Sequence, residues 1–146
     1  YDDKVIISSI PFLYILDANS GSTIFKESIS SIIKPIITKN GLFLITKDNL
    51  LVYKDLKKQK LVYSVSVATE IAKFLNTKKK SIVIKSFFIV NNELFIFLEN
   101  SYLVKFSING KVKGINKLPV KLGTSPIFIN NSILYLSKKN RLIILN

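Results

Sequence analysis

The chain has few side chains of the kinds that carry out catalysis. It contains no His and no Cys, which excludes a Ser–His or Cys–His nucleophile and a conventional zinc site. Its nine carboxylates are dispersed, and its five glycines form no phosphate-binding motif. Asp48, Asn49 and Asp55 offer oxygens to a calcium ion, but turns use the same side chains. We therefore predict no catalytic residue, no metal site, no cofactor and no enzymatic activity.

Positive charge dominates the remaining polar residues. The net charge is +13, and all of the 22 basic residues except Arg141 are lysines. Nucleic-acid grooves favour arginine, whose planar fork pairs with phosphate and guanine. The lysines instead occupy turns and alternate strand positions, where they protect strand edges. This pattern favours a solvated surface without specific nucleic-acid binding. A lysine-rich nucleic-acid-binding β domain is an alternative, and binding confined to low salt without sequence preference would count against it.

The size and composition of the chain favour a folded β-rich domain. With 146 residues, 48% of them hydrophobic, the chain is long enough to bury a core. The abundant β-branched and aromatic residues suit pleated sheets. The uncharged stretch 5–16 is too short for a membrane-spanning helix and contains a proline, so we expect no transmembrane segment. The chain begins within a strand pattern, which predicts that it is part of a longer protein.

The sequence repeats itself. The matching segments are Asp17 with Asp55, Leu42-Phe43 with Leu94-Phe95, and Asn91-Asn92 with Asn130-Asn131. Their offsets are 38, 52 and 39 residues, which indicates a natural period of 38 or 39 residues. The longer middle step leaves room for an insertion, which we place at residues 69–80.

Each repeat unit reads as four short strands separated by turns. In the second unit the strands start near Lys34, Leu42, Leu50 and Lys60. Asn40-Gly41 predicts a hairpin between the first two, because this dipeptide readily adopts positive φ at both turn positions. Stacked four-stranded sheets with a period near 40 residues are typical of a β-propeller. We therefore predict an all-β propeller of antiparallel blades over 1–146, with about four blades present and the terminal two incomplete.

The insertion is the one helical candidate. Thr69 is suited to cap its first turn, and Ile71, Phe74 and Leu75 fall on one helical face. Lys78, Lys79 and Lys80 follow at its C-terminal end, which favours positive charge. Two interpretations stay open: a helix buried against a blade edge, or an exposed element that binds a partner.

The turn after the third strand resembles a known repeat. The segment 16–25, "LDANSGSTIF", resembles the Leu-Asp-x-x-x-Gly-x-x-x-Trp core of the PQQ-like β-propeller repeat. Asp17 and Gly21 match, and Phe25 stands where that family has Trp. The second copy keeps Asp55 and places Tyr63 at the aromatic position. The resemblance implies that these five residues form the structural motif of the repeat, with each aromatic wedged between adjacent blades.

Two branches of this superfamily suggest different functions. Quinoprotein dehydrogenases hold pyrroloquinoline quinone and calcium with an acidic cluster, a cysteine pair and tryptophans, none of which this chain has. BamB-like lipoproteins are cofactor-free periplasmic propellers that scaffold outer-membrane β-barrel assembly. The resemblance to this second branch implies a non-catalytic scaffold for envelope proteins at the periplasmic face of a Gram-negative outer membrane. A fragment of a quinoprotein dehydrogenase is the alternative, which a missing response to quinone and calcium would discard.

Two sites of contact with other chains follow from this interpretation. The chain lacks the first strand of its opening blade and the last strand of its closing blade. We expect a second copy or a further chain segment to cover those edges. Propellers usually bind proteins through loops at one rim. We expect the 69–80 segment, with its apolar stripe and cationic end, to bind an acidic, partly apolar partner surface.

Overall fold

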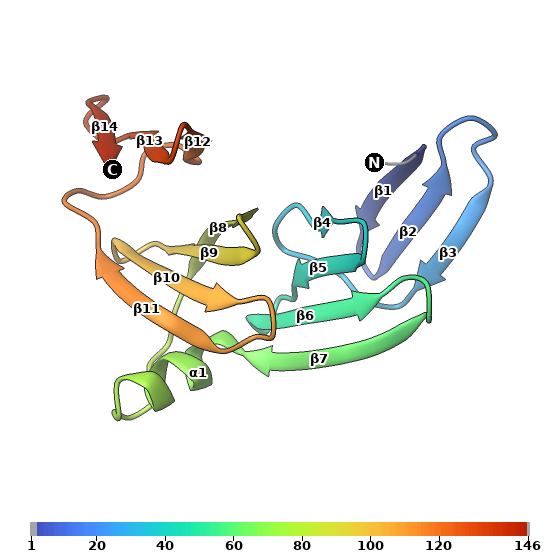
Figure 1. Ribbon diagram of the computed structural model, residues 1–146, viewed down its shortest axis with the longest axis horizontal. Helices are drawn as coiled ribbons and strands as arrows, with labels where there is room; N and C mark the ends of the chain where they lie inside the picture. The colour runs from blue at the N-terminus through green and yellow to red at the C-terminus, as the bar shows by residue number, and fades with distance from the viewer. Residues whose placement is uncertain (1–2, 146) are drawn as a thin grey trace. The chain divides into compact units, whose positions relative to one another are not determined.

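The computed structural model describes residues 3–145 and consists mainly of antiparallel strands (Figure 1). Tyr1, Asp2 and Asn146, which belong to the predicted 1–146 domain, lie outside the described residues. Within residues 3–145 the strands are β1 (Lys4–Ser9), β2 (Phe12–Asp17), β3 (Thr23–Glu27), β4 (Ile36–Ile37), β5 (Gly41–Ile45), β6 (Leu50–Asp55), β7 (Lys60–Ser66), β8 (Ile84–Val90), β9 (Glu93–Leu98), β10 (Tyr102–Ser107), β11 (Val112–Lys117), β12 (Ile127–Ile129), β13 (Ser132–Leu136) and β14 (Leu142–Leu145). One helix, α1 (Val67–Phe74), follows β7 in this part of the chain.

The strands form four antiparallel meanders in chain order. Sheet I contains β1–β3, sheet II β4–β7, sheet III β8–β11 and sheet IV β12–β14. Asp17 ends β2 as Asp55 ends β6, so β2 is equivalent to the third strand of sheet II and β1 to its second. Within the described part of the chain, sheet I therefore has no first strand and sheet IV no fourth. The prediction of an all-β chain with about four blades, the outer two incomplete, is confirmed.

The chain divides into two compact units, Tyr1–Val67 and Ala68–Asn146. In the first unit, sheets I and II share a core built from alternating apolar residues. Leu13 of β2 packs with Leu42 and Leu44 of β5 and with Val52 of β6, and all four are almost completely buried. Strand β5 is buried along its whole length, as expected for a strand covered on both faces. The side chains of one face of β5 thus fix sheet I against sheet II.

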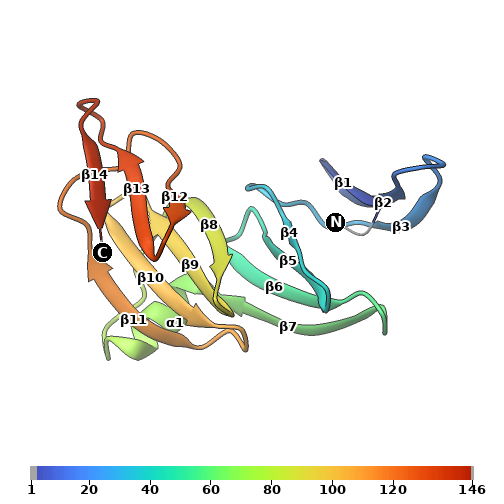
Figure 2. The same ribbon diagram turned by 45° about the horizontal axis from the view of Figure 1, so that its top comes forward.

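In the second unit, sheets III and IV pack through an aromatic cluster. Phe95 and Phe97 of β9 lie on one face, because alternate residues of a strand share a face. They surround Phe128 of β12, with ring centroids 5.2 and 6.3 Å from the Phe128 ring. Leu103 and Leu118 complete the buried cluster. Figure 2 shows β12–β14 beside β8–β11, as these contacts require.

The turns repeat as well, but one of them differs from its predicted position. Asn91 and Asn92 both have positive φ, as a two-residue hairpin of this type requires. At the equivalent turn of sheet II, the paired residues are Thr38 and Gly41, so the turn residues are 39 and 40. The predicted hairpin between β4 and β5 forms, but neither Asn40 nor Gly41 has positive φ, so the predicted conformation of the turn is wrong. Gly41 instead starts β5 at a point of close approach: an added Cβ would lie 2.2 Å from the Lys54 carbonyl oxygen.

No helix within residues 3–145 has the length and apolar character needed to cross a membrane.

Candidate functional site

The turn after the third strand is built around an aspartate in sheets I and II. The Asp17 carboxylate accepts hydrogen bonds from the backbone N–H groups of Asn19 and Ser20 at 3.0 and 2.8 Å. Asp55 accepts the equivalent bonds from Lys57 and Lys58 at 2.9 and 3.0 Å. The hydrogen bonds to Asp17, foremost those from Ser20, lower the pKa of Asp17 below its ordinary value because they stabilise the charged form. Asp17 and Asp55 therefore each stabilise their own turn, and they do not form a shared site.

Residues with positive φ complete these turns. Gly21 has φ of +69°, and Gln59 takes the equivalent position in sheet II with φ of +50°. Gly21 donates its N–H to the Asp17 carbonyl. Glycine adopts this conformation without a steric penalty, whereas Gln59 accepts a modest one.

The third copy of the turn is one residue shorter. Ser107 replaces the aspartate, its backbone N–H donates to the Lys111 carbonyl, and Gly110 is the residue with positive φ. As a result β11 pairs with a different offset: Gly114 lies opposite Lys105, where sheet II has Tyr63 opposite Tyr53. The 52-residue offset between the second and third repeat units takes Tyr63 to Ile115. The register of the strands shows that the equivalent residue is Gly114.

Phe25 packs between sheets I and II. It is half-buried and contacts the core cluster formed by β2, β5 and β6. The Lys54 ammonium lies 4.4 Å from the Phe25 ring centroid and 2.6 Å from a carboxylate oxygen of Glu27. A single buried lysine thus binds an aromatic ring and a carboxylate two residues apart on β3.

Tyr63 lies in an aromatic column across sheet II. Its ring centroid is 5.7 Å from that of Tyr53, which stacks at 4.3 Å on Phe43. Burial raises the pKa of the Tyr63 hydroxyl well above its ordinary value. Tyr63 and Phe25 hold equivalent positions on β7 and β3, opposite Tyr53 and Ile15 respectively.

Helix α1 begins before its predicted start. Val67, Ala68 and Ala72 are buried, and Thr69 lies within the helix rather than at its cap. Asn76 ends the helix in a left-handed conformation, φ +50°, while the N–H groups of 76 and 77 return to the carbonyls of 73 and 72. This is a Schellman ending. It directs the chain away from the helix before the three lysines are reached.

The predicted partner-binding residues divide into two groups. Ile71 and Leu75 line a shallow pocket of about 130 Å³ beside Lys78 and Lys80, with Ala68, Ala72, Thr77 and Ile82 as the remaining lining residues. Phe74 and Lys79 are outside this lining and are exposed; Phe74 is 49% exposed and Leu75 50%. The apolar stripe is therefore not buried, and charged and apolar groups occur together along this segment.

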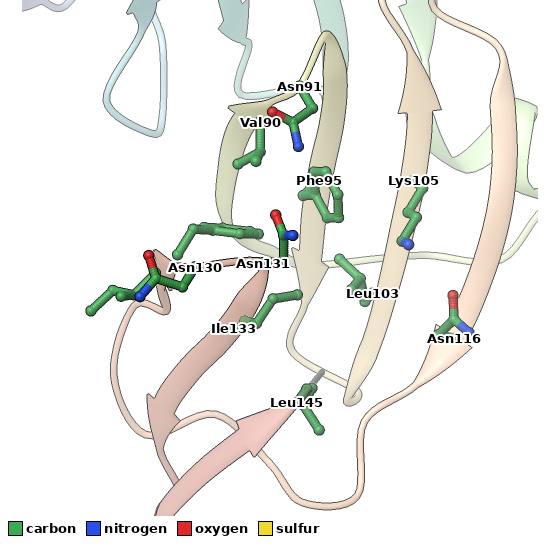
Figure 3. Close-up of a pocket in the computed structure, with 12 residues that line it drawn as sticks. Val90, Asn91, Phe95, Leu103, Lys105, Asn116, Asn130, Asn131, Ile133 and Leu145 are labelled. Carbon is green, nitrogen blue, oxygen red and sulfur yellow. The ribbon is translucent and has the colours of Figure 1, made fainter.

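A larger pocket, which the sequence did not indicate, lies between sheets III and IV (Figure 3). Its volume is about 550 Å³, within the range of ligand pockets. Apolar walls come from β8, β9, β10, β12, β13 and β14, and Lys105 is the charged residue among the lining side chains. The lining residues are Val90, Asn91, Phe95, Leu103, Lys105, Asn116, Phe128, Ile129, Asn130, Asn131, Ile133 and Leu145. Residues 3–145 contain no group of three His, Cys, Asp or Glu side chains that could hold a metal ion.

Known structures share this arrangement of sheets. No family model and no curated protein sequence matches the chain. BamB from Moraxella catarrhalis is similar in fold, with a TM-score of 0.67 and 13% identity over 98% of this chain and 42% of BamB. The computationally designed Ika4 protein gives a TM-score of 0.71 with 11% identity, over 99% of this chain and 86% of Ika4. Hsv2p from Kluyveromyces lactis gives 0.64 with 13% identity, over 99% of this chain and 42% of Hsv2p.

The chain has a propeller-like fold. At these identities the likeness concerns the fold alone, and the chain spans about two fifths of the length of BamB. Any function specific to this chain must therefore be sought in residues that depart from the repeating four-stranded sheet. Two features depart from the repeat: the α1 segment, and the pocket on the face of sheet III where Lys105 stands at the position of Tyr53.

Proposed function

We propose that this chain is part of a non-catalytic, protein-binding propeller scaffold with a BamB-like role in outer-membrane β-barrel assembly. It would act at the periplasmic face of the outer membrane of a Gram-negative bacterium. Three observations support this proposal: the propeller-like fold, the likeness to BamB, and the PQQ-like pattern at Asp17, Gly21 and Phe25 with its second copy at Asp55 and Tyr63. In this proposal the repeat residues are structural and the partner binds elsewhere.

The observation that carries the proposal is the exposure of the α1 segment. Phe74 and Leu75 are half-exposed on a segment that the repeat does not need. Lys78, Lys79 and Lys80 follow, all exposed, and no carboxylate in residues 3–145 forms a salt bridge with any of them. An acidic surface with an apolar centre complements this combination, since charge steers association and apolar contact holds the complex.

Point substitutions test this proposal better than deletion of the segment. Removing α1 would also remove Val67, Ala68 and Ala72, which are buried, and would destabilise the fold. We expect Phe74→Ser with Leu75→Ser to weaken binding to the purified periplasmic region of the barrel-assembly complex by about tenfold or more. Lys78→Glu with Lys80→Glu should slow association and make it less sensitive to salt.

The matched control is a charge reversal far from this segment in the sequence. Lys138→Glu with Lys139→Glu changes the net charge by the same amount as the α1 reversal, and both lysines are exposed in the β13–β14 turn. We expect it to change affinity much less. The proposal is wrong if the wild-type chain does not bind the assembly complex, or if the α1 variants bind as tightly as the control.

A further inference from the structure

We propose that the pocket between sheets III and IV binds an extended partner segment in which an aromatic residue is followed two positions later by an acidic one. The inference rests on the proposed function only in that the occupant is part of a protein. It concerns a different surface from the α1 segment, and different residues carry it.

The pocket lies where the repeat loses its aromatic column. In sheet II, Phe43 pairs with Tyr53 and Tyr53 with Tyr63, one residue from each of three adjacent strands. The equivalent column in sheet III is Phe95, Lys105 and Gly114. Two tyrosine rings are thus replaced by a flexible lysine and a hydrogen atom. The pocket opens on this face of sheet III, with Phe95 and Lys105 among its lining residues.

The geometry around Gly114 supports this explanation. No atom lies within 4 Å of a Cβ added at Gly114, so the backbone leaves room for a side chain there. Asn116, two residues along on the same face of β11, lines the pocket. Gly114 is not itself a lining residue, but its cross-strand partner Lys105 is. A side chain added at position 114 would therefore project from the same face of sheet III as Lys105 and Asn116.

The chain contains an example of the proposed recognition. On β3, Phe25 and Glu27 lie two residues apart and therefore on one face. Both are bound by Lys54, at 4.4 Å to the ring centroid and 2.6 Å to the carboxylate. Cation–π attraction and a charge-assisted hydrogen bond act together at one ammonium group. A lysine that faces an extended segment can thus bind an aromatic residue and an acidic residue spaced two positions apart on that segment.

Lys105 offers an ammonium group in the pocket whose charge, after the hydrogen bond from Lys113, helps to lower the pKa of Glu93, but which has no carboxylate of residues 3–145 at salt-bridge distance. Its ammonium lies 5.3 Å from the Phe95 ring centroid. Within residues 3–145 no carboxylate forms a salt bridge with Lys105, and the nearby Glu93 is bonded to Lys113 at 2.7 Å. Figure 3 shows Asn91 and Asn131 beside Phe95, with Lys105 on the next strand. These carboxamides can bond to the backbone of an extended occupant.

A capped heptapeptide with the sequence of residues 22–28, Ser-Thr-Ile-Phe-Lys-Glu-Ser, is a suitable probe. Its binding to the ¹⁵N-labelled chain is followed by NMR chemical-shift titration at up to millimolar concentration. We expect shifts at Lys105, Gly114 and Asn116. Peptides in which the Phe is replaced by Ala, or the Glu by Gln, should bind several-fold more weakly.

Three variants locate the site. Gly114→Tyr restores the aromatic of sheet II and should abolish binding, whereas Gly114→Ala leaves the pocket open and should retain it. Lys105→Gln should weaken binding of the Glu peptide several-fold and leave that of the Gln peptide unchanged. Lys111→Gln, an exposed lysine outside the pocket, is the charge control.

The inference is overturned if no shifts occur in sheets III and IV at millimolar peptide, or if the Gly114→Tyr variant binds as well as the wild type. These results are separate from the test at α1. Loss of peptide binding with intact capture of the assembly complex rejects the pocket assignment alone. Peptide binding without capture rejects the proposed scaffold function and leaves the pocket as a peptide site.

Discussion

Single side chains at turns make part of the fold sensitive to acid. Asp17 accepts hydrogen bonds from the N–H groups of Asn19 and Ser20 and from the Ser20 hydroxyl, and the pKa of Asp17 is lowered in the folded state. A lowered folded pKa means that the folded state binds the proton more weakly than the unfolded chain does. The resulting stabilisation is complete above the unfolded value near 3.8 and is lost as the pH falls through the folded pKa.

Asp17→Asn isolates this contribution, because the amide oxygen can accept the same backbone bonds without carrying charge. We expect the urea midpoint of the wild type to exceed that of Asp17→Asn at about pH 6 and the difference to shrink toward about pH 2.5. Circular dichroism at several pH values measures both midpoints. A difference that is constant with pH would contradict the assignment of the lowered pKa to this turn.

Phe25 is the residue whose loss should affect the contact between sheets I and II. Because it is half-buried, Phe25→Ala should cost about 2 kcal/mol, below the 3–5 kcal/mol typical of a fully buried ring. Part of this cost arises because Lys54, 91% buried, loses its aromatic partner. Glu27→Gln should cost less, since the Glu27 side chain is 42% exposed. Urea denaturation measures both, and equal costs would contradict this order.

At the scale of the element, two glycines in equivalent sheets have opposite roles. Gly41 begins β5, and an added Cβ would lie 2.2 Å from a backbone oxygen and 2.8 Å from the Tyr53 ring. Gly114 in β11 has open space instead. We expect Gly41→Ala to destabilise the chain by about 2 kcal/mol through overpacking. Gly114→Ala should be neutral or stabilising by up to about 1 kcal/mol, because it restricts the unfolded chain. Thermal and urea denaturation of the matched pair checks this, and equal effects would contradict the register assigned to β11.

The same elements show how far sequence reasoning reaches. The strands and their period were predictable, because two-residue alternation and turn residues are local signals. The start of α1 was not, since Val67 continues the apolar pattern of β7 and only its burial marks the change. The pocket was not predictable either. Its lining residues come from every strand of sheets III and IV, so it depends on how these two sheets pack together.

At the scale of the whole molecule, sheets I and IV each have an unpaired strand edge in the part of the chain that the structure describes, whereas the equivalent strands of sheets II and III are paired with a further strand of their own sheet. Among the described residues 3–145, strand β14 pairs with β13 alone, whereas its counterparts β6 and β10 pair on their other side with β7 and β11. Leu142 and Ile144 of β14 are more than half exposed, and Val5 and Ile7 of β1 nearly so. An uncovered strand with exposed apolar side chains is a template for pairing with another chain. Such an edge can form contacts between copies of the chain.

We therefore expect the 146-residue polypeptide to self-associate at low micromolar concentration through its edges. Leu142→Lys with Ile144→Lys should reduce association, because charges on an edge strand oppose pairing. Val83→Lys is the control, since Val83 is 53% exposed but lies between α1 and β8, outside any strand. Sedimentation velocity over a range of concentrations measures association for all three proteins. A monomeric wild type, or a β14 variant that associates as strongly as the Val83 control, would show that the open edge does not drive assembly.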